Sequence, residues 1–254
     1  MCVVARDPRE PSGPTTGRFV VTSTAGPVVE LRVWGVDRVA TALGRMATGR
    51  RALARTPGVR FAKLLGTASG DSFTLAGADA RHWAALTVWE DDAAARAGKD
   101  AHAVRQWRSA SSEELRISMR PIRSRGTWSG VDPFTDVDSH GSATSWPGPV
   151  AALTRARLRP TRMLSFWRAV PPVAAALGHA DGVRLALGVG EFPIGVQGTF
   201  SVWDSADALA DFAYRTTAHR GAIRDTTQRR WYAEEMFTRL AVTGVEGTYR
   251  GRPA

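Results

Sequence analysis

The sequence contains a single cysteine, Cys2, in a chain of 254 residues. One thiol cannot form an intrachain disulfide, so the fold must be held together by its core. Cys2 also lies in a polar stretch, residues 1–20, that we expect to be a disordered tail. This argues against a thiolate-ligated haem and against any cysteine cluster. A buried metal in this chain would therefore need histidine or carboxylate ligands.

Long apolar runs are also missing. None approaches the roughly 18 residues that a membrane-spanning helix requires, and the four apolar residues at the N-terminus are followed by charge and proline rather than by a secretory signal. We therefore expect a cytoplasmic protein. Its apolar fraction of 43% and charged fraction of 23% are typical of a globular domain.

Lysine is scarce, because Lys63 and Lys99 are the only two, so the net charge of +10 comes from arginine. The arginines are spread along the chain without a basic tract or a nucleic-acid motif, so we do not expect nucleic acid as a partner. An acidic electron donor of the ferredoxin type, or peripheral contact with an anionic membrane, suits this charge equally well. A homo-oligomer is compatible with the sequence.

Apolar periodicity predicts the same order of elements twice. In residues 21–122 we expect strands at 28–33, 59–67, 82–89 and 114–121, with helices opening at Asp37 and at Asp91 or Asp92. Residues 123–149 are rich in Gly, Pro and Ser and read as a connection. In residues 150–245 we expect strands at 150–158, 182–188, 196–203 and 234–242, with helices opening at Thr161 and at Asp204 or Ser205.

Short matches between the halves support an internal duplication. The tripeptide GVR occurs at 58–60 and at 182–184, and VW at 88–89 recurs at 202–203. A βαββαβ unit covers only one face of its sheet with helices, so two units can bury their open faces against each other. We therefore predict an α+β fold of two tandem ferredoxin-like (βαββαβ) repeats, forming a dimeric α+β-barrel-type single-chain domain.

One histidine falls on the apolar face of the helix that follows Trp203. Steps of three and four residues place His219 in line with four neighbours, Leu209, Phe212, Thr216 and Ile223. Such a histidine is either a core residue with one hydrogen bond or a ligand of a metal or haem iron. Periodicity alone leaves both interpretations open. In strand 150–158, Arg155 and Arg157 also share one face.

Several segments resemble the spheroidene monooxygenase family of carotenoid ketolases. They are KLLGTASG (63–70), RGTWSGVDPF (125–134), LTRARLRPTRMLSFWRAVPP (153–172), GVGEFP (188–193), QGTFSVW (197–203), AYRTTAH (213–219) and WYAEEMFTRL (231–240). The resemblance runs in order over most of residues 28–243. It implies a haem-containing monooxygenase with a fold like that of the chlorite dismutase group and the aldoxime dehydratases.

The resemblance also implies roles for individual residues. It makes His219 the expected iron ligand of haem b, with His102 of the first half as the rival. An apolar pocket would be built from aromatic side chains of the second half, namely Phe192, Phe200, Trp203, Phe212 and Trp231. Haem propionates would need a cationic partner, for which Arg239, Lys63 and Arg184 are the candidates. Gln197 and Thr199 are expected to supply catalytic hydrogen bonds inside the pocket.

The expected activity is therefore a haem-dependent monooxygenation of a hydrophobic or secondary-metabolite substrate, with O2 or peroxide as oxidant. The alternatives are a haem-dependent dehydration or bond rearrangement, and a haem or ligand carrier without turnover. A cofactor-free barrel is a further alternative. Nothing in the sequence alone identifies the substrate.

Overall fold

The computed structural model describes residues 26–69, 77–134, 146–162, 165–166, 176–191, 196–215 and 231–253. The first half of the chain contains β1 (Val28–Val36), α1 (Val39–Ala54), β2 (Val59–Ser69), β3 (Ala78–Trp89), α2 (Asp92–Gly98), α3 (His102–Arg108) and β4 (Ser111–Gly126). The second half contains β5 (Val150–Leu158), the 3₁₀ turn η2 (Pro160–Arg162), β6 (Val183–Glu191), β7 (Val196–Trp203), α5 (Ala206–Arg215), β8 (Tyr232–Tyr249) and β9 (Arg252–Pro253).

The strands form one antiparallel ring. Their order is β4-β1-β3-β2-β6-β7-β5-β8, and a further pairing of β8 with β4 closes the ring. The short β9 pairs with β8. Within the first half the order is β4-β1-β3-β2, and the second half repeats it as β8-β5-β7-β6. The predicted mixed α+β fold is confirmed. That both halves descend from one ferredoxin-like unit stays a prediction.

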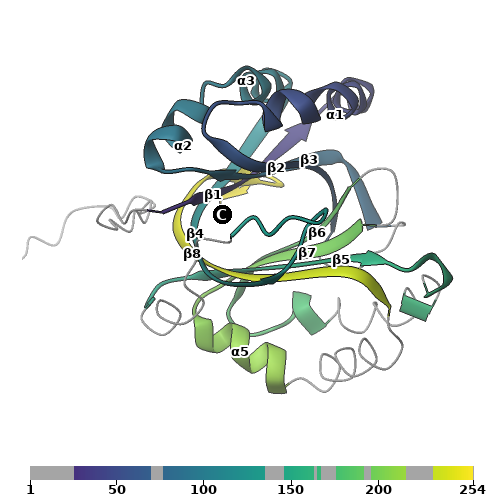
Figure 1. Cartoon of the computed structure of the whole chain (residues 1–254), viewed down its shortest axis with the longest axis vertical. Helices are drawn as coiled ribbons and strands as arrows, with labels where there is room; N and C mark the ends of the chain where they lie inside the picture. Colours follow the sequence, from purple (N-terminus) through teal and green to yellow (C-terminus); the bar gives the residue numbers. More distant parts are fainter. Residues whose placement is uncertain are drawn as a thin grey trace, which may run out of the picture.

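Helices cover the ring from outside. Figure 1 shows α1, α2 and α3 above the strands of the first half and α5 below those of the second. Because side chains alternate along a strand, each strand has one face toward the inside of the ring and one toward the helices. This alternation explains why all nine residues of β1 are buried.

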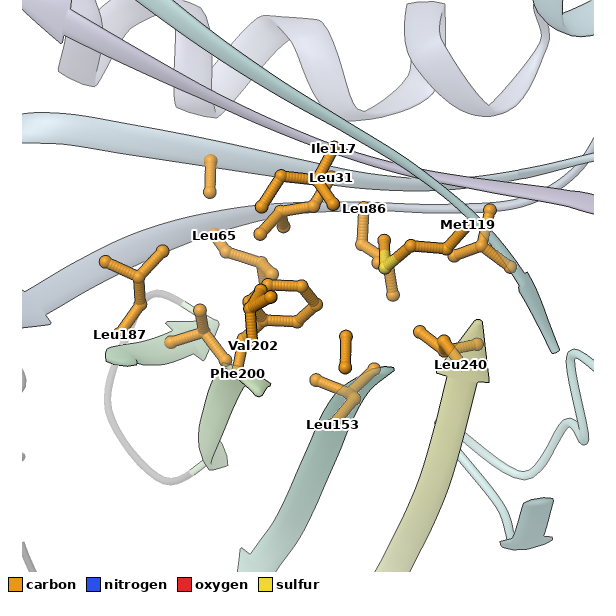
Figure 2. Packing of buried hydrophobic residues seen from close by; sticks show 14 of the residues in the cluster. Leu31, Leu65, Leu86, Ile117, Met119, Leu153, Leu187, Phe200, Val202 and Leu240 are labelled. Atoms are coloured by element: carbon orange, nitrogen blue, oxygen red, sulfur yellow. The ribbon is translucent and has the colours of Figure 1, made fainter. Parts of the chain in front are cut away.

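The inside of the ring is packed with apolar side chains. Figure 2 shows leucine, isoleucine and methionine side chains of the first half meeting Leu153, Leu187, Phe200 and Leu240 of the second. The segment that follows β4 contributes Trp128 and Phe134 to the same cluster, at 1% and 3% exposure. At about 25 cal/mol per Å² of apolar surface, this cluster is the main source of stability that joins the two halves.

Local sequence explains most element boundaries. The Asp91 carboxylate accepts a hydrogen bond from the backbone N–H of Ala94 at 2.8 Å and caps α2. Ser205 does the same for α5, accepting from the N–H of Ala208 at 3.2 Å. For α1 the predicted start at Asp37 is one residue early, because Arg38 occupies the N-cap position and has no capping side-chain bond.

One expectation about length needs correction. In α1, Ala42, Met46 and Leu53 form the inward stripe and Leu43 lies outside it at 44% exposure. The strand expected to end at Pro121 runs on to Gly126, four residues into the stretch 123–149 that was read as a connection. It continues because Pro121 lies beside an irregularity in the β4–β8 register, where a missing N–H is tolerated.

No helix in the described ranges is both long and apolar enough to cross a membrane. The expected tail, residues 1–20, lies outside the described residues, as does the predicted helical continuation beyond Arg215.

Candidate functional site

The helix-side face of the second half is lined by small side chains. Ala186 of β6, Ser201 of β7 and Ala152 of β5 are register partners in one row across three strands. Gly188, Thr199 and Thr154 form the next row. Their neighbours Leu153, Leu187 and Phe200 face the inside of the ring, so these two rows face outward by alternation. We call them the small-residue strip.

The corresponding face of the first half is filled instead. Trp34 of β1 stacks on Trp107 of α3 with ring centroids 5.3 Å apart, and Trp83 of β3 lies 6.5 Å from Trp107. These indoles pack with α1 into a closed core. In the second half Ala152, Thr154, Ala186 and Thr199 are only partly buried. The helix-side face of the second half therefore carries small side chains that are less completely covered than the tryptophans of the first.

One end of the strip is closed by aromatic rings. Trp203 is fully buried, its indole N–H donates to the Ser201 hydroxyl at 2.9 Å, and its ring lies 5.2 Å from that of Phe212 in α5. Two of the predicted pocket aromatics thus come together on the helix side. Phe200 does not join them, because its position in β7 has the opposite parity and places it inside the ring.

The other end of the strip carries Trp231. Its indole N–H donates to the Ser165 hydroxyl at 2.9 Å, and Phe166 packs edge-on against it at 5.6 Å. The β5–β8 register pairs Val150 with Ala241 and Leu158 with Tyr232. Eight residues along a strand span roughly 25 Å, so Trp231 lies far from Trp203, with the strip between them. Trp203 and Trp231 can therefore line one pocket, as predicted, only if the ligand is long enough to span the distance between them.

Two arginines border the strip on its β8 side. Arg239 lies beside Ala152 in the β5–β8 register, and directly opposite Arg123 in the β4–β8 register. The adjacent residues in each strand, Thr238 and Ser124, hydrogen-bond to each other at 2.9 Å on the inner face of the sheet. Because side chains alternate along a strand, Arg239 and Arg123 face outward. Neither arginine has a carboxylate partner among the described residues. Sequence reasoning missed Arg123, because it fell in the expected connection.

The other candidate propionate partners are already paired. Lys63 points to the inside of the ring, where its ammonium contacts Glu191 at 3.1 Å and Ser129 at 2.7 Å. Arg184 forms an exposed ion pair with Asp204. Of the three predicted cations, Arg239 is therefore the one whose position and lack of a partner suit an anionic ligand at the strip.

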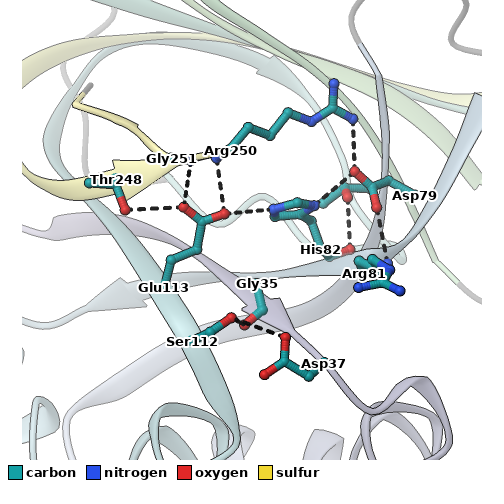
Figure 3. Close-up of polar contacts among 11 residues, drawn as sticks. Gly35, Asp37, Asp79, Arg81, His82, Ser112, Glu113, Thr248, Arg250 and Gly251 are labelled. Carbon is teal, nitrogen blue, oxygen red and sulfur yellow. Dashed lines mark hydrogen bonds and ion pairs between the residues drawn. The ribbon is translucent and has the colours of Figure 1, made fainter.

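The described histidines are poor candidates for an iron ligand. His102, the predicted rival, lies exposed in the first turn of α3, and His179 is exposed as well. His82 is occupied at both ring nitrogens, with Nδ1 2.8 Å from Asp79 and Nε2 2.8 Å from Glu113 (Figure 3). In the described ranges no group of three or more metal-binding side chains gathers. His219, Phe192 and the side chain of Gln197 lie outside the described residues.

The residues at the small-residue strip are of the kinds that a flat apolar cofactor with acidic side chains, such as haem b, would contact. Small side chains line the strip, Trp203 and Phe212 offer apolar contact, and Arg239 and Arg123 offer positive charge for propionates. The hydroxyls of Thr199 and Thr154 are adjacent on the same face and could hydrogen-bond a bound oxygen ligand or substrate. A sequence signal for the strip exists in retrospect: small residues alternate with larger ones along VAALTRARL.

A scan against family models finds no match. Among curated proteins, the chain is 33% identical over 230 residues to spheroidene monooxygenase of Rhodobacter capsulatus, covering 89% of this chain and 94% of the relative. It is 38% identical over 223 residues to spheroidene monooxygenase of Rubrivivax gelatinosus, covering 87% and 80%. The enzyme of the same name from Cereibacter sphaeroides is 28% identical, over 88% of this chain and 66% of the relative.

Two solved structures share the fold. One is an aldoxime dehydratase with a TM-score of 0.59 and 12% identity, covering 87% of this chain and 82% of the other. The second is an aldoxime dehydratase in complex with butyraldoxime, also at a TM-score of 0.59 and 12% identity, with coverages of 88% and 83%. At this identity the likeness concerns the backbone arrangement alone.

Proposed function

This chain belongs to the spheroidene monooxygenase family, and from that premise we propose that it is a haem-dependent monooxygenase acting on an elongated hydrophobic substrate of the carotenoid type. Monooxygenase-type chemistry comes with the family. The haem, its ligand and the substrate are our inferences. They rest on the small-residue strip, whose partly buried small side chains contrast with the tryptophan-filled face of the first half.

We place haem b against this strip. Arg239 and Arg123 would hold the propionates, since two unpaired guanidinium groups on adjacent strands need an anion near them. Trp203 and Phe212 would pack on the macrocycle. Our proposed iron ligand is still His219, which follows Ala213 of α5 by six residues in the sequence. Haem, when bound, supplies the activation of O2 or peroxide needed to oxidise a C–H bond.

The chain's own residues would do three things in the reaction. Trp203, Phe212 and Trp231 would exclude water, so that the reactive oxidant meets only substrate. The hydroxyl of Thr199 would hydrogen-bond the oxygen ligand, and that of Thr154 would support it. The distance between Trp203 and Trp231 would suit an extended polyene along the strip.

Electrons would come from an acidic donor protein of the ferredoxin type, which the net charge of +10 favours. We also infer that the halves are duplicated ferredoxin-like units, because both have the strand order fourth, first, third, second. A haem-dependent dehydration, or a carrier without turnover, stays the alternative.

The test combines spectroscopy with product mass. Protein purified with haem should show a Soret band that is lost in His219→Ala and kept in His102→Ala, whose histidine is exposed. With O2, a reductant and a linear carotenoid, the product should gain the mass of oxygen. A product that loses the mass of water indicates dehydration instead. A wild-type chain that takes up no haem on reconstitution contradicts the proposal.

A further inference from the structure

A cavity opens at one end of the ring, on the opposite side of β5 from the small-residue strip. Its volume is about 440 Å³, and it is formed by the turn after β4 (residues 127–130), by β5, by the end of β6 and by the start of β8. We call it the mouth pocket. Because Arg155 and Arg157 have the opposite parity to Thr154 and Ala156, they face this pocket and not the strip.

Arg155 is a buried cation with unused hydrogen-bonding capacity. Its side chain is 2% exposed, and its Nη1 donates to Glu234 at 2.6 Å and to the carbonyl of Thr127 at 3.2 Å. Its guanidinium also lies 5.5 Å from the centre of the Trp128 ring. Its Nε is fully enclosed, whereas its Nη2 is not and donates no hydrogen bond to any described residue. An acceptor in the pocket would satisfy this N–H.

The carboxylates at the pocket are already satisfied. Glu234 accepts from the N–H of Gly130 at 2.7 Å, from Arg155 at 2.6 Å and from the Thr127 hydroxyl at 2.9 Å. Burial alone would raise the pKa of Glu234, but these hydrogen bonds outweigh it and lower the pKa to about 2. Glu234 therefore stays charged and fully engaged, with little capacity left for Arg157, which is 3.8 Å away.

Glu191, the other acid, is engaged as well. It receives the indole N–H of Trp128, the ammonium of Lys63 at 3.1 Å and the guanidinium of Arg50 at 2.9 Å. Four cations thus surround two carboxylates, the cations being Lys63, Arg50, Arg155 and Arg157. The lining itself is balanced, with Arg155 and Arg157 against Glu191 and Glu234, and Lys63 and Arg50 on Glu191 give the whole cluster an excess of two positive charges. This excess favours an anion.

The turn that roofs the pocket is held in an unfavourable conformation. Ser129 has φ of +60° and Gly130 has φ of +75°, and Trp128 and Val131 exchange two backbone hydrogen bonds around them. A positive φ is costly for serine but not for glycine. The Ser129 hydroxyl oxygen accepts from Lys63 at 2.7 Å, which leaves its hydrogen free to donate.

We propose that the mouth pocket binds a small oxyanion, a carboxylate or a phosphate, through the Nη2 of Arg155, the guanidinium of Arg157 and the hydroxyl of Ser129. The bound anion joins β5 to the turn after β4. Since β5 also carries Thr154 on its other face, occupancy of the mouth pocket stiffens one wall of the strip. The proposal does not depend on haem.

Isothermal titration calorimetry in a chloride buffer at constant ionic strength tests it, with inorganic phosphate and succinate as separate probes. We expect saturable one-site binding that weakens about tenfold in Arg157→Gln, since a charge-assisted hydrogen bond contributes about 1.5–3 kcal/mol. Arg184→Gln is the matched control, because it removes an equally exposed arginine from an ion pair away from the pocket. Its affinity should equal that of the wild type.

Arg155→Gln alone could unfold the chain, because it leaves Glu234 buried without its cation. The double variant Arg155→Gln, Glu234→Gln removes both charges and should fold but bind neither probe. Tighter binding of one probe identifies the ligand class as phosphate or carboxylate. Absence of saturable binding of both probes to the wild type, or equal weakening in Arg157→Gln and Arg184→Gln, overturns the proposal.

Discussion

Arg239 of β8 and Arg123 of β4 are directly opposite partners in the antiparallel β4–β8 register, so two arginines project from neighbouring positions on the helix face of the second half. Like charges at directly opposite positions destabilise a sheet by a few tenths of a kcal/mol or more. The arrangement is understandable when an anion lies between them. The repulsion between the two arginines therefore lowers the stability of the ligand-free chain and raises its affinity for an anion.

Replacing either arginine should separate these two effects. We expect Arg239→Gln to raise the stability of the haem-free chain by about 0.5 kcal/mol, because it removes the repulsion. The same variant should bind haem about tenfold more weakly, measured by Soret titration. Haem dimethyl ester, which lacks the propionate charges, should bind variant and wild type alike. Unchanged affinity for haem would rule out the role in propionate binding.

The small-residue strip can be tested by filling it. Thr154 is only partly buried and faces the strip, so Thr154→Phe should leave the fold intact while blocking the flat site. We expect loss of the Soret band in Thr154→Phe and its retention in Thr154→Val, which keeps the shape of threonine. Circular dichroism checks folding of both. Normal haem uptake by the phenylalanine variant would place the cofactor elsewhere.

Thr199 can be examined by an isosteric change. Thr199→Val removes the hydroxyl and little else, so haem binding should be unchanged. If the hydroxyl hydrogen-bonds a reacting oxygen, turnover should fall by about tenfold or more, since one donor to a developing charge contributes a few kcal/mol. Steady-state kinetics with a linear carotenoid measures the effect. Equal turnover in the two proteins would make Thr199 a lining residue only.

The low pKa of Glu234 predicts a specific acid response. Its pKa is lowered from 4.5 to about 2 in the folded chain, so its contribution to stability is complete above about pH 4.5 and is lost as the pH falls toward 2. Allowing for screening, the contribution is about 2 kcal/mol. Glu234→Gln should lose this much stability at pH 7 and converge with the wild type near pH 2. Urea unfolding at several pH values measures it, with the exposed Glu246→Gln as control.

Much of this architecture could be predicted from sequence, because a strand with one buried face shows a visible alternation of apolar and polar residues. Strand 150–158 and strand 196–203 have the predicted bounds. The predicted parity also placed Arg155 and Arg157 on one face. What periodicity could not show is which face meets the helices, since both faces of β1 are buried. For that reason the sequence left open which side of β7 Phe200 faces, and the structure places it inside the ring.

The candidate site was harder to predict because it depends on long-range register. Arg123 and Arg239 are 116 positions apart in the chain and meet only through the pairing that closes the ring. Pro121 obscured that strand, as proline normally ends one. The interior position of Trp128 and Phe134 was equally hidden, because their segment is rich in Gly and Pro and resembles a surface loop.

The contacts of His82 lead to a last prediction, about the C-terminal end of the chain. Its ring bridges Asp79 and Glu113, with Nδ1 2.8 Å from the first carboxylate and Nε2 2.8 Å from the second. Glu113 also accepts from the N–H groups of Arg250 and Gly251, each at 3.0 Å. Burial raises the pKa of both carboxyls, but hydrogen bonds outweigh it and hold each pKa below its usual value. His82 therefore helps to fix the carboxylate that anchors the β8–β9 turn.

We expect His82→Phe to destabilise the chain by about 1–3 kcal/mol, because phenylalanine fills the same space beside Tyr249 but leaves two partly buried carboxylates each short of a donor. Amide hydrogen exchange should accelerate at Arg250 and Gly251 and stay unchanged in β1, since local opening of the anchor does not require unfolding of the core. The exposed His102→Phe is the matched control and should change neither quantity. Both depressed carboxyl pKa values imply stability lost on acidification, so the difference between His82→Phe and wild type should shrink as the pH falls through them. Unchanged exchange at Arg250 and Gly251 in His82→Phe would show that the anchor is held without His82, by Thr248, Arg250 and the backbone.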